Sequence, residues 1–79
     1  MKLTMKTHLH ALRESLRPKI GQEKLARKSD MSLQTYRNAE KGVNVSYTTA
    51  TAILAALNEL LVENGRDGVQ LEDLGLTIV

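Results

Sequence analysis

Apolar residues recur at intervals of three and four along most of the 79-residue chain, and this is the period of an α-helix. In the clearest run, six apolar residues share one helical face: Ala50, Ile53, Leu54, Leu57, Leu60 and Leu61. A chain of this length buries only about 60 to 65% of its unfolded surface, which is enough for one core. We therefore predict an all-α fold and a single domain over residues 1–79.

In the first half of the chain, the sequence predicts two helices joined by a short connection. The first begins near Met5 and ends before Pro18, because a residue that precedes proline rarely stays helical. The second begins at Gln22 and has scarcely two turns before it stops at Ser29. An acidic Glu23 in its first turn suits the positive end of the helix dipole.

Capping residues mark the ends of two further predicted helices. Ser32 is a suitable N-cap for a third helix, and Gly42 stands where a left-handed C-cap would be needed. Ser46 caps a fourth helix, which carries the apolar face described above and stops at Asn64. A single helical turn is expected at Leu71–Asp73.

The tail, residues 74–79, changes from the helical period to an alternation of two, which predicts a short C-terminal β-strand. A lone strand is unstable, and within the chain only the three-residue segment 43–45 alternates in the same way. We expect two copies to pair their tails in a twofold homodimer. The alternative is a tail packed irregularly over its own core. The expected dimerisation residues are Leu74, Leu76 and Ile78.

Charge divides the chain into two unlike halves. Residues 1–42 hold ten of the eleven Lys and Arg residues and four acids, a net charge of +6. Residues 43–79 hold one Arg and five acids, a net charge of −4. A basic half favours a polyanionic partner such as nucleic acid.

The predicted third helix has two distinct faces when it is projected at about 100° per residue. Thr35, Tyr36 and Ala39 fall toward the core. The opposite sector is mostly polar and contains Leu33, Gln34, Arg37, Asn38 and Lys41. Gln and Asn can pair with adenine, Arg with guanine, and an aliphatic side chain with a thymine methyl group. This face therefore suits contacts with double-stranded DNA.

The stretch 21–42 reads Gly-Gln-Glu-Lys-Leu-Ala-Arg-Lys-Ser-Asp-Met-Ser-Leu-Gln-Thr-Tyr-Arg-Asn-Ala-Glu-Lys-Gly. It resembles the helix-turn-helix unit of the lambda-repressor-like (Cro/CI, XRE-type) family, and the resemblance covers residues 9–61. The resemblance implies a domain of four to five helices with its helix-turn-helix unit at about 22–42. It also implies a sequence-specific transcriptional regulator, a repressor, that binds a pseudo-palindromic operator as a homodimer.

The same resemblance assigns roles to DNA-binding residues. Gln22 would bond a phosphate of the DNA backbone. Ser32 would cap the third helix, which is the recognition helix of this family, beside the same DNA strand. Leu33, Gln34 and Asn38 would meet base edges, and Lys41 and Asn44 would touch the backbone beyond that helix. Arg37 joins them through its place on the outer face. The family often pairs an Arg of the first helix with the acid at Glu40, and both Arg13 and Arg17 remain open for this role.

Other function classes lack their residues. The chain has no cysteine, and His8 and His10 would point about 200° apart on a helix, so we expect no metal site. No nucleophile motif or phosphate-binding glycine loop is present, so we expect neither a cofactor nor an enzyme. The longest apolar run, 53–57, is too short to span a bilayer, and without a secretory signal we expect a cytoplasmic location.

Two alternatives keep the fold and change the function. In the first, the chain is the antitoxin of a toxin–antitoxin pair, whose acidic half and apolar tail grip a toxin while the basic half represses the operon. In the second, it is a protein-binding adaptor that does not read DNA. Co-purification of a second chain would favour the antitoxin, and a flat salt dependence of DNA binding would favour the adaptor.

Overall fold

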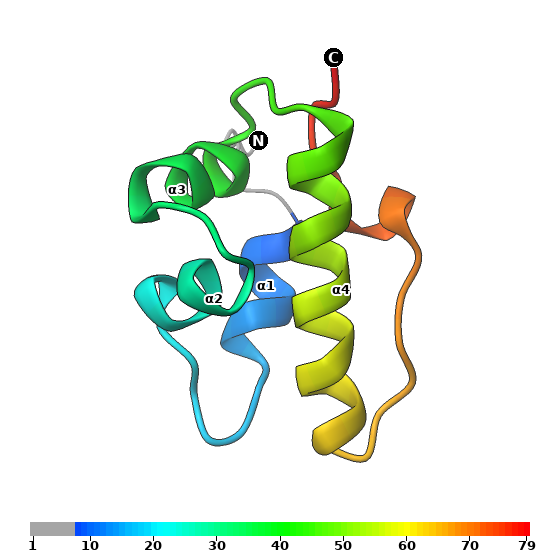
Figure 1. Ribbon diagram of the computed structural model, residues 1–79. Helices are drawn as coiled ribbons and strands as arrows, with labels where there is room; N and C mark the ends of the chain where they lie inside the picture. Colours follow the sequence, from blue (N-terminus) through cyan, green and yellow to red (C-terminus); the bar gives the residue numbers. More distant parts are fainter. Residues whose placement is uncertain (1–7) are drawn as a thin grey trace, which may run out of the picture.

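A computed structural model describes residues 8–79 and places four α-helices around one core (Figure 1). The elements follow one another as α1 (His8–Glu14), α2 (Gln22–Lys28), α3 (Leu33–Lys41), α4 (Tyr47–Glu63) and the short 3₁₀ helix η1 (Leu71–Leu74). α2 packs against both α3 and α4, whereas η1 packs against α1 and α4. The predicted all-α fold is confirmed.

The helix ends follow the predicted caps closely. The Oγ atoms of Ser32 and Ser46 each accept a hydrogen bond from the backbone N–H three residues later, at 3.1 Å in both cases. Gly42 ends α3 in the left-handed conformation, with φ of 88°. α1 ends at Glu14, earlier than the predicted limit before Pro18, and the predicted start at Met5 lies outside the described residues.

The apolar face of α4 forms the centre of the core. Of the six residues predicted for this face, only Leu54 is partly exposed, and the other five are buried. The other elements and the connection after α1 add large side chains that are fully buried, namely Leu9, Leu16, Leu25, Tyr36 and Leu74. Burying one such side chain stabilises the fold by about 1.5 to 3 kcal/mol. Because α4 has more buried residues than any other described element, it contributes most to the core.

The C-terminal strand predicted for residues 74–79 does not form. Leu74 belongs to η1, and its side chain is fully buried in the core of its own chain. Leu76 also packs against that core, whereas Ile78 is partly exposed. The first two apolar residues of the alternating tail, Leu74 and Leu76, therefore pack on the core without a continuous β-ladder, whereas Ile78 does not.

The tail makes one short backbone connection to the segment between α3 and α4. Val45 and Ile78 form a single parallel β-bridge. The N–H of Val45 donates to the oxygen of Thr77 at 2.9 Å, and the N–H of Val79 donates to the oxygen of Val45 at 3.0 Å. Accordingly, Figure 1 shows the C-terminus beside the connection that leads into α4. The short segment 43–45 thus supplies the partner that the tail required.

No helix in the described part of the chain is long and apolar enough to cross a membrane.

Candidate nucleic-acid interface

α2 and α3 are joined by a turn of four residues that sets the angle between them. Ser29 donates its hydroxyl to the oxygen of Leu25 at 2.8 Å, and the N–H of Met31 donates to the oxygen of Ala26 at 3.0 Å. Between them, Asp30 adopts a positive φ of 60°, which Asp tolerates better than most residues. Ala26 is almost fully buried, and its small side chain permits the close approach of the two helices.

A buried carboxylate ties this helix pair to α1. Glu40 accepts a hydrogen bond from Arg13 Nε at 2.6 Å and one from the Tyr36 hydroxyl at 2.6 Å. Gln22 Nε2 donates to the same carboxylate at 2.8 Å. Arg13 also donates to the oxygen of Ile20 at 3.0 Å. We name the side chains of Arg13, Gln22, Tyr36 and Glu40 the Glu40 cluster, and it joins α1, α2 and α3.

Electrostatics within the Glu40 cluster favour the ion pair. Burial alone would raise the pKa of Glu40, but the hydrogen bonds from Arg13, Tyr36 and Gln22 outweigh it and hold this pKa below its ordinary value. Burial alone would lower the pKa of Arg13, yet the hydrogen bond and charge of Glu40 raise it. Burial and the bond to Glu40 raise the pKa of Tyr36. The cluster thus holds a carboxylate, a guanidinium and a neutral phenol.

The structure decides which arginine meets Glu40, a question that the sequence left open. Arg13 makes the ion pair, whereas Arg17 is exposed and donates to backbone oxygens of Glu14 and Leu16. The sequence alone did not decide it, because Leu9, Arg13 and Arg17 are spaced by four residues within a helix that was predicted to end before Pro18. Arg13 follows Leu9 by four residues and so lies on the buried face of α1, while Arg17 lies beyond the helix end. The hydroxyl of Tyr36 was missed, because the helical projection assigned its ring only to packing.

The outer face of α3 presents the polar side chains predicted for DNA contact. Gln34 and Arg37 are exposed and Asn38 is half-buried. Gln34 Nε2 donates to Asn38 Oδ1 at 3.0 Å, so the two amides form a connected pair. Leu33, at the start of the helix, is only partly exposed because it also packs against the core. Part of the Leu33 side chain therefore packs on the core, and part remains on the surface.

The remaining predicted residues lie at the two ends of this face. Ser32 caps α3 and is exposed, and Lys41 and Asn44 are exposed at and beyond its C-terminus. Gln22 is half-buried at the start of α2, and its oxygen accepts a hydrogen bond from Arg37 Nε at 3.3 Å. The amide of Gln22 thus connects the Glu40 cluster to the outer face of α3.

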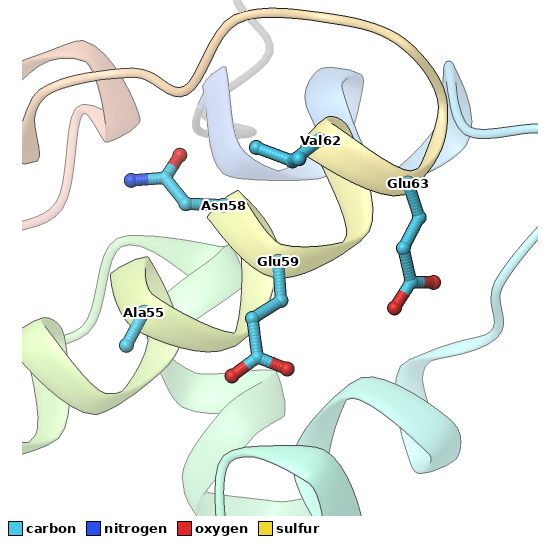
Figure 2. Close-up of a pocket in the computed structure, with 5 residues that line it drawn as sticks. All are labelled: Ala55, Asn58, Glu59, Val62 and Glu63. Carbon is cyan, nitrogen blue, oxygen red and sulfur yellow. The ribbon is translucent and has the colours of Figure 1, made fainter.

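A second surface feature lies on the C-terminal half of α4. Figure 2 shows the residues that line a hollow here, which are Ala55, Asn58, Glu59, Val62 and Glu63. Val62 is 63% exposed. Asn58 holds the following loop in place, because its amide both donates to and accepts from the backbone of Val69. The described residues include no group of three or more His, Asp or Glu side chains suited to a metal ion.

Comparison with known proteins agrees with this geometry. The helix-turn-helix family model matches residues 9–64, which includes α2, α3, α4 and all of α1 except His8. Comparisons with curated proteins and with solved structures returned no match. The chain belongs to the helix-turn-helix family of the Cro/CI (XRE) type, a family of DNA-binding regulators.

Proposed function

We propose that the chain is a transcriptional repressor that binds a pseudo-palindromic operator as a homodimer. The observation that carries the proposal is the paired amides of Gln34 and Asn38 on the outer face of α3, next to Arg37 and Lys41. Amide groups at this place can read base edges in the major groove, while cations bind phosphates. Bound beside a promoter, such a chain would exclude RNA polymerase.

The hydrogen bond between Gln34 and Asn38 supports a role in base reading. It leaves the oxygen of Gln34 and one N–H of its amide group available, which is the combination that pairs with adenine. The exposed part of Leu33 suits a thymine methyl group. Phosphate contacts then fall to the residues at the ends of the face, which are Gln22, Ser32, Lys41 and Asn44.

A homodimer is favoured by the open edge of the tail. The bridge to Val45 uses the oxygen of Thr77 and the N–H of Val79, so the backbone groups of Ile78 face the other way. Within residues 8–79 these groups make no backbone hydrogen bond. Exposed apolar side chains gather at the same end of the molecule, namely Val43, Tyr47, Ile78 and Val79. Two such edges could pair across a twofold axis while Leu74 stays in its own core.

The experiment that tests the function is selection of bound sequences from a random duplex pool, followed by titration of the selected duplex at several salt concentrations. We expect an inverted repeat whose half-sites lie about one helical turn apart. The absence of enrichment would contradict sequence-specific binding.

Substitution of the two amides tests their part in that function. Gln34→Ala and Asn38→Ala should each weaken binding to the selected duplex by about 1 to 3 kcal/mol, with a much smaller effect on random duplex, because base contacts carry the discrimination. Circular dichroism should show unchanged helix content, since Gln34 is exposed and Asn38 is half-buried. Equal losses on both duplexes would contradict base reading.

Protein binding is a second candidate function, and the hollow on α4 favours it. The exposed Val62 offers an apolar contact, whereas Figure 2 shows Glu59 and Glu63 on another side of α4, where Glu59 forms an ion pair with Lys28 at 2.9 Å. An exposed apolar side chain of this kind fits a partner protein, as the toxin of a toxin–antitoxin pair or the target of an adaptor would be. DNA binding with little salt dependence and no enriched sequence would make this the leading function.

A further inference from the structure

The amide of Gln22 is fixed in one orientation by its two neighbours. Its nitrogen donates to Glu40 Oε1 at 2.8 Å, and its oxygen accepts from Arg37 Nε at 3.3 Å. An ionised carboxylate can only accept and a guanidinium can only donate, so the reversed amide would lose both bonds. The buried Glu40 therefore sets, through Gln22, where the side chain of Arg37 is held.

This restraint draws Arg37 away from the base-reading amides. Arg37 belongs to α3, but its hydrogen bond reaches to the first residue of α2. Arg37 therefore lies between the two helices, whereas Gln34 bonds Asn38 along the outer face of α3. Reaching a base edge in front of α3 would cost Arg37 its bond to Gln22.

The donors that remain free suit a phosphate group. The bond to Gln22 uses Nε of Arg37, and the two terminal nitrogens of this exposed guanidinium make no hydrogen bond within residues 8–79. Those nitrogens form the edge that binds phosphate in a bidentate manner. Gln22 keeps one further N–H on its nitrogen. Because Arg13 balances the charge of Glu40, the surroundings of Arg37 remain favourable for an anion.

We propose that Arg37 and Gln22 bind one backbone phosphate of the DNA as a unit, with Glu40 as their positioning residue. Arg37 thus contributes affinity and does not select bases. This inference rests on the proposed DNA-binding function and assigns to Arg37 a role different from that of its neighbours Gln34 and Asn38.

The test measures the affinity of the full chain for the selected duplex and for random duplex at several salt concentrations. Arg37→Gln should weaken both by the same factor, about tenfold at low salt, and should reduce the slope of log K against log salt by about one. Gln22→Ala should weaken binding in the wild-type background, but much less in the Arg37→Gln background, because the unit has already lost its cation.

Lys41→Gln is the matched control, since Lys41 is an exposed cation on the same helix without a hydrogen bond to Gln22. Lys41→Gln should also reduce the slope of log K against log salt by about one. Its loss of binding free energy should add to the loss caused by Gln22→Ala. Thermal melting of each variant checks the fold, and Arg37→Gln tests the slope while every side chain of the Glu40 cluster remains unsubstituted.

The outcomes separate this inference from the function on which it rests. If Arg37→Gln weakens binding to the selected duplex alone, Arg37 reads a base and the proposed unit is wrong, while the function stands. Additive effects of Arg37→Gln and Gln22→Ala would also overturn the unit. If the wild-type chain binds neither duplex, the DNA-binding function fails, and the unit fails with it.

Discussion

Glu40 contributes to the stability of this fold and, through Gln22 and Arg37, to its proposed function. Its carboxylate receives side chains from α1, α2 and α3, and it is 4% exposed. A buried carboxylate is tolerated only when it is paired and hydrogen-bonded, and both conditions hold here. Any change to its partners should therefore alter the free energy of unfolding.

Tyr36→Phe tests one of these bonds. Removal of the hydroxyl leaves the ring in place and takes one donor from an ionised acceptor, so the free energy of unfolding should fall by about 1.5 to 3 kcal/mol. Urea denaturation measures it. Tyr47→Phe is the control, because Tyr47 is 64% exposed, and this change should stay within about 0.5 kcal/mol. Equal effects of the two substitutions would contradict the importance of the Glu40 bond.

Acid should abolish the contribution of Glu40. Because the folded state lowers its pKa below the ordinary value of 4.5, the stability it supplies is present above pH 4.5 and is lost as pH falls through the folded pKa. Urea denaturation of the wild type and of Tyr36→Phe should show their free energies of unfolding converging as the pH falls below the folded pKa of Glu40. If the difference between the two free energies of unfolding stays constant with pH, the hydrogen bond from Tyr36 does not depend on an ionised Glu40.

Sequence patterns predicted the elements of this fold unequally. The caps at Ser32, Gly42 and Ser46 were readable because each satisfies a backbone need that few residue types can meet. The tail was misread because alternation of apolar residues is shared by strands and by irregular segments packed on a core. Only the buried position of Leu74, which depends on α1 and α4 together, separates the two cases.

The two serine caps offer a comparison between one helix at the proposed DNA surface and one that mainly builds the core. Ser32→Ala and Ser46→Ala remove hydrogen bonds of the same length, so each should lower the free energy of unfolding by about 1 kcal/mol. Only Ser32→Ala should also weaken DNA binding, measured where both variants are fully folded. Equal losses of DNA affinity in the two variants would contradict a specific contact between Ser32 and DNA.

For the molecule as a whole, the uneven charge of the sequence follows the architecture. The basic half builds α1, α2 and α3, and the acidic half builds α4 and the tail. Composition could predict this division, but it could not predict which arginine would be buried or how the tail returns to Val45. Both depend on contacts between residues 27 or more positions apart, which local patterns do not encode.

Ile78→Pro tests the proposed homodimer. Proline removes the N–H of residue 78, which the bridge to Val45 does not use, so the tail should stay on its own core while its outer edge loses a donor. Light scattering should show a dimer for the wild type and a shift toward monomer for the variant. A variant that keeps the dimer mass would exclude pairing through this edge. If the wild type is monomeric at every concentration tested, it does not form a dimer in the absence of DNA.

The bridge between Val45 and Ile78 joins the tail to the segment that carries Asn44, one of the proposed phosphate contacts. The position of the tail and the position of the Asn44 segment therefore depend on each other. A molecule that bound the tail only after detaching it from Val45 would loosen that segment and weaken DNA binding. Reciprocity then requires DNA to weaken the hold of that molecule by the same factor.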